Sequence, residues 1–469
     1  MLTYFPRYFS IRAIICYAVT LALVSALFIS HAMPFQFMLF GLVPVLLFFT
    51  YSNKLTMNWQ HFSERIFTRR LFVTALLIRI VYVVFIYFYY IEMTGLPHMY
   101  HPGDELIYEY MGPLLKEEGF SRFRELLVVY RFGFSDSGYC WWLAIENLLL
   151  GTHPLSYRMV KCILDAFACV LMYNLAKRNF GESVGRITAV FCMLMPNMWY
   201  YCGLTLKETE MAFMTILFVE RADMALRVPK ITFQNILLPG LIILAMFTFR
   251  TALAAVLAAA LVGALILSSG KQLQTWKKIL YSAVFAIWML LTVGTEMIEE
   301  TRQLWEGREN NQTTGYEWRA ARENGNTFAQ YATASVFAPL IFTIPFSSMV
   351  AIPDQENQMM MNGANFIKNV LSGFTIFALV SLLFSGKWRR HVLPIAVTCG
   401  YLVVLVFSNF AHSERFHFPV LAFELMFAAY GVSLVMNKHK RWYTMWLVGV
   451  CVANFIWAWI KLAGRGYSI

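Results

Sequence analysis

Charged residues are scarce in this chain of 469 residues: Asp, Glu, Lys and Arg make up 14% of the sequence, against 59% for hydrophobic residues. Soluble globular proteins carry about 25% charged and about 45–50% apolar residues. Low-complexity tracts, internal repeats and any stretch polar enough for a soluble domain are also missing. The composition therefore excludes a soluble globule, and the mean hydropathy of +0.56 predicts a polytopic membrane protein.

Paired cysteines are missing as well. The eight cysteines are scattered and have no paired spacing, and most fall in apolar segments. This pattern argues against a disulfide framework and against a zinc–thiolate site. The apolar cysteines are Cys16, Cys162, Cys169, Cys192, Cys399 and Cys451.

Acidic residues are fewer than basic ones, which gives a net charge of +11. A nucleic-acid partner does not follow, because the basic residues gather in short loops between apolar segments, as they do in cytoplasmic loops of membrane proteins. Residues 11–31 have the length of a membrane span and lack a small-residue cleavage site, so we expect them to remain as the first helix.

The apolar segments predict an all-α fold with thirteen spanning helices. Two further apolar segments, 138–151 and 336–352, are short. The expected spans are 11–31, 35–51, 71–92, 155–176, 184–201, 207–226, 231–249, 251–268, 279–296, 366–385, 392–410, 416–436 and 443–463.

The charge of the loops sets the expected topology. Six basic loops share the cytoplasmic side only if 138–151 and 336–352 do not cross the membrane. We therefore expect both to be re-entrant or surface-lying helices, and Pro339 and Pro345 favour this for the second. The outer side then holds 93–154, 202–206, Arg250, 297–365 and 411–415. We predict a multi-pass inner-membrane protein with its chemistry on the extracytoplasmic side.

An acidic cluster opens the first outer loop, in His101-Pro-Gly-Asp104-Glu105. Carboxylates at a membrane boundary are costly and are often functional. Asp104 or Glu105 has the chemistry of a general base or of a metal ligand. The alternative is that both only cap the amphipathic helices expected up to residue 131.

Three further outer positions carry charges between apolar spans. Lys207 and Glu208 begin one span. The alternative to a functional role is that the lysine snorkels to the membrane surface and the acid starts the helix. Arg250 occupies a tight hairpin, where a guanidinium binds a phosphate or pairs with a carboxylate. The turn at 412–419 holds His412, Glu414, Arg415 and His417, in which Arg415 is a candidate anion ligand and the two histidines are a weak metal signal.

In its order of motifs the chain resembles the GT-C superfamily of polyprenyl-phosphate-sugar glycosyltransferases, which includes protein O-mannosyltransferases and the lipid A aminoarabinose transferase. The likeness covers roughly residues 70–440. Its elements are Asp104-Glu105, the segment 138–151, Arg158, the inner turn 177–181, Pro196 followed by 200–208, and Glu414-Arg-Phe-His-Phe-Pro419.

The resemblance implies a lipid-linked sugar donor, a lipid, glycan or protein acceptor, and transfer on the outer face. Asp104 would be the catalytic carboxylate, Glu105 its neighbour and Glu208 a second acidic position, while a divalent metal is an open alternative to having no cofactor. Two spans precede the family's usual first helix, and Glu208 follows a lysine instead of belonging to an Asp motif. No large soluble C-terminal domain follows the spans, so we expect a single-sugar donor.

Chemical reasoning leads to the same residues, because a departing lipid phosphate needs fixed cations and an acceptor hydroxyl needs a base. The cations would be Lys207, Arg250 and Arg415. We expect accessory roles for His101, Arg158, His412, Glu414 and His417. Two rival functions remain: an envelope polysaccharide polymerase or ligase using a lipid pyrophosphate, and a transporter, for which Arg79, Lys161 and Asp165 are intramembrane charges.

Three regions organise the chain in this interpretation. Residues 1–70 form an N-terminal hairpin with a basic loop, 71–440 the catalytic core, and 441–469 a last helix and tail.

Overall fold

The structure is a computed structural model, and it describes residues 2–118, 134–227, 233–267, 338–407, 411–435 and 440–467, with single positions 125, 302, 325, 326 and 328 between them. Within these ranges the regular elements are helices, and an isolated β-bridge joins Ala32 to Val350. The α-helices are α1 Arg7–Leu27, α2 Phe35–Asn58, α3 Glu64–Thr94, α4 Gly103–Glu118, α6 Phe134–Leu150, α7 Pro154–Phe180, α8 Glu182–Leu194, α9 Pro196–Cys202, α10 Glu208–Arg227, α11 Phe233–Phe249, α12 Thr251–Leu267, α15 Glu356–Met360, α16 Asn362–Phe384, α17 Val392–Phe407, α18 Glu414–Leu434 and α19 Lys440–Ala463.

The all-α prediction is confirmed for the described residues. Each expected span contains a helix, except that 279–296 lies outside the described residues. Within the described ranges, seven helices are long and apolar enough to cross a membrane: α1, α2 with the 3₁₀ turn that follows it, α3, α7, α16, α18 and α19. The apolar part of α11 (Leu237–Phe249), α12 and α17 are shorter, so the number thirteen remains a prediction.

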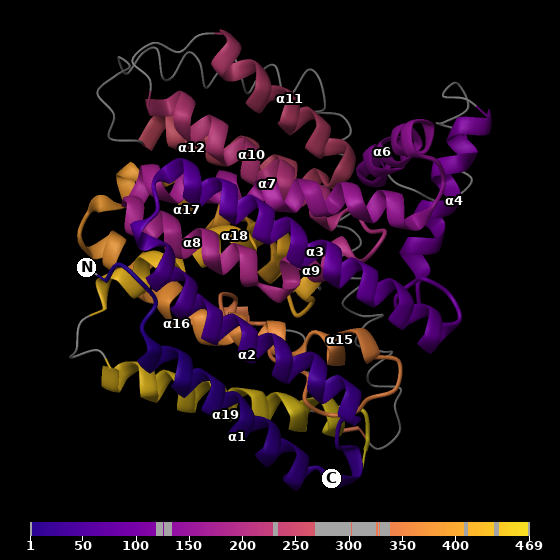
Figure 1. Cartoon of the computed structure of the whole chain (residues 1–469), viewed down its shortest axis with the longest axis vertical. Coiled ribbons are helices and arrows are strands. Elements are labelled where there is room, and N and C mark those ends of the chain that lie inside the picture. The colour runs from indigo at the N-terminus through magenta and orange to yellow at the C-terminus, as the bar shows by residue number, and fades with distance from the viewer. Residues whose placement is uncertain are drawn as a thin grey trace.

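Helix α18 lies at the centre of the bundle. Its neighbours are α16, α8, α10, α17 and α7. Within its most apolar 18-residue stretch, 94% of the residues are buried inside the protein. A helix that is apolar on all sides needs such surroundings. The terminal helices α1 and α19 pack on each other at one edge, whereas α11 lies at the opposite edge (Figure 1).

The expected span 184–201 is two helices. Residue Met195 has φ −67° and ψ 119°, so α8 ends there and α9 begins at Pro196. A proline has no N–H to continue the helix and forces the residue before it out of the helical region. The prediction of one continuous helix was wrong at this position.

The segment 336–352 is not the helix that we expected. From residue 338 onward it contains the 3₁₀ turn Ala338–Leu340 and then an irregular chain that is buried between Ile344 and Val350. Side chains from neighbouring helices satisfy its backbone: Asn369 Nδ2 donates to Pro345 O over 2.9 Å, and Ser347 N donates to Asn454 Oδ1 over 2.7 Å. Irregular backbone is tolerated at membrane depth where protein surrounds it in this way.

The segment 138–151 does form a helix, α6. It packs on α4 and α11, and α4 and α6 lie together at one end of the bundle (Figure 1). The expected amphipathic helices of the first outer loop are represented by α4, and nearly all of the loop between α4 and α6 lies outside the described residues. Whether α6 is re-entrant stays a prediction.

Candidate functional site

Arg415 joins two carboxylates that are far apart in the sequence. Its Nε donates to Glu208 Oε1, and its Nη1 donates to Asp104 Oδ2. The three residues come from the N-terminal turns of α18, α10 and α4. Because all three helices begin at the same end of the bundle, a small set of expected residues converges there.

The two carboxylates differ in their access to solvent. Asp104 is 50% exposed, whereas Glu208 is 0% exposed. Glu208 Oε2 is buried and has no hydrogen-bond partner among the described residues. Glu208 therefore depends on nearby cations for its charge, while the half-exposed Asp104 can meet an incoming molecule.

Lys207 is held by groups from two neighbouring helices. Its Nζ donates to Asp136 in α6, to Ser135 O over 3.1 Å and to Phe249 O over 2.6 Å. All of its N–H donors are thereby occupied. Lys207 ties α10 to α6 and α11, and Tyr108 donates to the same Asp136 carboxylate over 2.9 Å.

Arg250 lies between α11 and α12, and its guanidinium has few partners among the described residues. Its guanidinium lies 4.3 Å from the Phe416 ring, and Nη1 donates to the Tyr401 hydroxyl over a long 3.4 Å. Phe416 follows Arg415 in the chain, so the two arginines flank one region. A guanidinium on an aromatic face still offers its edge to an anion.

Glu105 is buried and has both oxygens engaged. Oε2 accepts from Met99 N over 2.8 Å, and Oε1 accepts from Thr205 N over 2.6 Å. Arg158 lies nearby, with its Nη2 3.9 Å from Glu105 Oε1, and it also donates to Pro97 O. The pair thus fastens the loop before α4 to the loop before α10, and Asp104 is the more accessible of the two acids.

Glu109 and Thr205 are members of this region that the sequence analysis missed. Thr205 Oγ1 donates to Glu109 Oε1 over 2.5 Å, and His98 Nε2 lies 3.5 Å from Glu109 Oε2. Burial raises the pKa of Glu109. Its spacing of four residues from Glu105, which places both acids on one face of α4, was the available signal.

The expected accessory histidines contact residues of α15, α16 and α19. His101 is 59% exposed, has φ 53° and lies 3.3 Å from Glu356. His412 stacks on Trp457 at 5.0 Å. His417 is buried beside Lys368, with 2.8 Å between Nδ1 and Nζ, and its Nε2 lies 2.8 Å from Ala411 O.

Glu414 is partly buried at the first turn of α18. It precedes Arg415 directly and lies at the end of the bundle where the carboxylates meet. Among the described residues, no group of three or more His, Cys, Asp and Glu side chains has the arrangement of a metal site.

A second set of buried charges lies where α6, α7 and α10 meet. Lys161 Nζ lies 3.1 Å from Glu210 Oε2, and Trp142 Nε1 donates to Glu146 Oε1 over 2.7 Å. Burial, with the nearby Glu210 carboxylate, raises the pKa of Glu146 to about 8. Glu146 and Glu210 were both missed, although ionisable residues inside apolar segments are themselves a signal.

The intramembrane charges that suggested a transporter have partners within the chain. Arg79 of α3 donates through Nε to Asp165 of α7, and its side chain also reaches Met193 O over 3.2 Å. Arg79 and Asp165 are almost completely buried. The pair links α3, α7 and α8.

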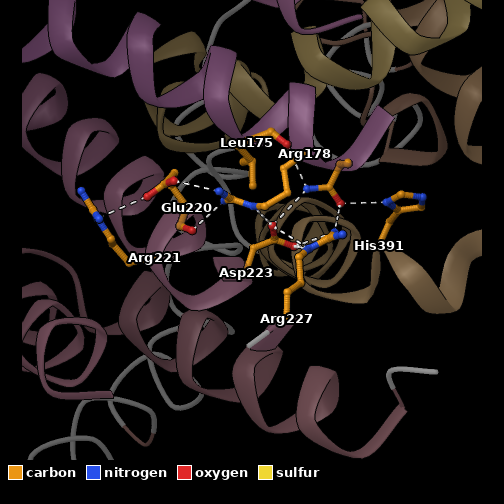
Figure 2. A network of polar contacts seen from close by, with 8 residues as sticks. Leu175, Arg178, Glu220, Arg221, Asp223, Arg227 and His391 are labelled. Atoms are coloured by element: carbon orange, nitrogen blue, oxygen red, sulfur yellow. Dashed lines mark hydrogen bonds and ion pairs between the residues drawn. The ribbon is translucent and has the colours of Figure 1, made fainter. Parts of the chain in front are cut away.

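At the opposite end of the bundle, α7 and α10 are joined by a charged network (Figure 2). Arg178 lies between two acids, with Nε donating to Asp223 Oδ2 over 2.6 Å and Nη1 to Glu220 Oε1 over 3.1 Å. Arg227 Nη2 and His391 Nδ1 both reach Asn179 Oδ1 over 2.8 Å. Burial and the Arg227 charge lower the pKa of His391 to about 4, so a neutral His391 donates this bond. These residues belong to loops and helix ends that we expect on the cytoplasmic side.

Together, the helices and their buried ion pairs define a multi-pass, all-α membrane protein. Comparisons with protein-family models and with curated proteins find no match. Among solved structures, the oligosaccharyltransferase of Archaeoglobus fulgidus, in complex with Zn and sulfate, is similar at 13% identity and a TM-score of 0.38. The alignment covers 71% of this chain and 45% of that one, so the chain spans less than half of that protein's length. A likeness of this size carries no argument about activity.

Proposed function

We propose that the chain is a membrane glycosyltransferase that moves a single sugar from a polyprenyl-phosphate donor to an acceptor hydroxyl on the extracytoplasmic face. The observation that carries the proposal is the bridge from Arg415 to Asp104 and Glu208, with Arg250 beside it. It joins an accessible carboxylate to guanidinium groups at one end of the bundle. A lipid-phosphate leaving group needs both kinds of residue.

In the proposed reaction Asp104 accepts the proton of the acceptor hydroxyl. The acceptor oxygen then forms a bond to the anomeric carbon of the donor sugar, and the bond from that carbon to the phosphate oxygen breaks. Arg250 and Arg415 stabilise the negative charge that collects on the departing phosphate. Glu208 fixes the direction of Arg415, because it holds Nε from a fully buried position.

Lys207 and Glu105 act indirectly in this proposal. Lys207 fastens α6 and α11 to the start of α10, and Glu105 fastens the loops that precede α4 and α10, the helices that carry Asp104 and Glu208. A divalent cation would meet Asp104 and Glu208 first, but Arg415 already bridges these two carboxylates.

The test is sugar transfer in proteoliposomes, with a panel of polyprenyl-phosphate monosaccharides as donors. Asp104→Asn should lower turnover by about 10²–10⁴-fold, because the amide cannot take the acceptor proton. Glu117→Gln, which alters an exposed acid on the same helix α4, is the matched control and should retain activity. Full transfer by Asp104→Asn would remove Asp104 as the base.

The same assay separates the rival polymerase or ligase. Such an enzyme would accept a lipid-pyrophosphate oligosaccharide and leave the monophosphate donors unused. A transporter would give no transfer with either donor.

A further inference from the structure

The Arg415 guanidinium binds two carboxylates, and the free-energy cost of breaking the two ion pairs differs. Nε holds Glu208, which is 0% exposed, and Nη1 holds Asp104, which is 50% exposed. Each carboxylate accepts one hydrogen bond from the guanidinium, so neither pair forms a two-bond fork. The two contacts are therefore unequal.

Releasing Glu208 would leave a charge buried without a partner, which is strongly destabilising. Asp104 can instead exchange Arg415 for water, because half of its side chain already faces solvent. Exposed ion pairs contribute little to stability. Asp104 is thus the partner that Arg415 can exchange.

A phosphate is a better partner for the freed guanidinium edge than a single carboxylate oxygen. Arginine binds phosphate through two parallel hydrogen bonds, and such forks are among the strongest hydrogen bonds in proteins. A second guanidinium lies close by, since Arg250 packs 4.3 Å from the ring of Phe416, the residue after Arg415. A phosphate that replaced Asp104 would bind the Arg415 guanidinium, with a second guanidinium packed on the same first turn of α18.

We infer that the Asp104–Arg415 contact is an autoinhibitory contact, which the donor phosphate opens by taking the place of Asp104 on Arg415. Before the donor binds, Asp104 Oδ2 is engaged by Arg415. After the exchange this oxygen is free to accept the proton of the acceptor hydroxyl. The base is thereby released only when a donor is present, and the donor binds before the acceptor is activated. The inference rests on the proposed function.

If Asp104 and the phosphate compete for Arg415, removing Asp104 should strengthen phosphate binding. A site without this competition would not show the effect. The probe is undecaprenyl phosphate added to the full chain in lipid nanodiscs, with undecaprenol as the comparison that lacks the phosphate. Asp104→Asn should bind undecaprenyl phosphate roughly fivefold more tightly than the wild type, because a half-exposed competing ion pair has been removed. Asp104→Ala, which removes the contact by a different change, should behave in the same way.

Glu117→Gln is the control for charge alone, because it removes one negative charge from the same helix at an exposed position. Its affinity should equal that of the wild type, and thermal unfolding of each variant establishes that it is folded. The wild type should prefer undecaprenyl phosphate to undecaprenol. If it does and both Asp104 variants bind undecaprenyl phosphate equally or more weakly, the exchange is overturned and the proposed function stands. A wild type without that preference would overturn both.

Discussion

The main-chain N–H of Thr205 donates to Oε1 of Glu105 over 2.6 Å, across 100 residues of sequence. Met99 N donates to the other oxygen over 2.8 Å. A carboxylate can accept both bonds, whereas an amide has one accepting oxygen and turns its NH₂ group toward the other N–H. The charge of Glu105 is therefore part of how the two loops are joined.

Glu105→Gln should lower the free energy of unfolding by about 1–3 kcal/mol, the usual cost of an unsatisfied buried polar group. Its turnover should fall less than that of Asp104→Asn. The half-exposed Asp104 should show the reverse, with a large loss of turnover and little change in thermal unfolding. Measuring both properties for both variants tests this division, and a fully stable Glu105→Gln protein would contradict it.

Arg250→Ala should weaken donor binding by about tenfold to a hundredfold, because a bound phosphate loses a charge-assisted hydrogen bond. Arg250→Lys should restore only part of the affinity, since an ammonium cannot form the two-bond fork. Donor titration in nanodiscs measures both effects. Arg69→Ala, an exposed arginine in α3 near the opposite end, is the control. Unchanged affinity in Arg250→Ala would exclude Arg250 from the phosphate site.

Arg415→Met should destabilise the protein by about 3–5 kcal/mol, because it leaves the buried Glu208 without its partner. Adding Glu208→Gln removes the stranded charge and should recover a large part of that loss. Thermal unfolding of the two single variants and the double variant gives the coupling between the residues. Additive losses would mean that Glu208 does not depend on Arg415.

Glu146 predicts a specific dependence of stability on pH. Burial raises its pKa from 4.5 to about 8, so the folded protein keeps a proton that the unfolded chain releases. The stability that this group contributes is complete below about pH 4.5 and is lost as pH rises toward 8. Compared with Glu146→Gln, the wild type should lose thermal stability between about pH 5 and 8 and change no further above that. A constant difference between the two proteins across this range would show that Glu146 titrates normally.

Sidedness can be measured with a membrane-impermeant maleimide on single cysteines in a background without the native ones. Positions 100 and 413 should react from outside, and positions 54, 178 and 389 only after the membrane is opened. External labelling at 178 would overturn the re-entrant assignment of 138–151. Position 310, which is expected outside, lies beyond the described residues. External labelling at 54 or 389 would overturn the assignment of the basic loops to the cytoplasm.

The helices could be predicted because a run of about 20 apolar residues leaves few other structures in a membrane. The segment 336–352 shows where this reasoning fails. Its composition is as apolar as that of a helix, and its actual path depends on Asn369 and Asn454, which lie far along the chain. Pro339, Pro345 and two adjacent serines were the local signals against a helix.

The site could be predicted as a set of charges but not as a set of pairs. Loop sidedness was enough to bring Asp104, Glu208 and Arg415 to one end. Lys207 is held by Asp136 and Phe249 O, whereas the Arg250 guanidinium has one long hydrogen bond among the described residues. This difference depends on how α6 and α11 approach α10. Local sequence patterns do not predict how helices that are distant in the chain pack together.

The buried irregular segment 344–350 also bears on how the protein is made. Ser347 N finds its acceptor on Asn454, which is synthesised 107 residues later. Until α19 has packed, Ser347 N therefore lacks this acceptor, whereas Asn369 of α16 already binds Pro345 O. A chain that stops between α16 and α19 should leave this buried N–H without its acceptor, at a cost of about 1–3 kcal/mol.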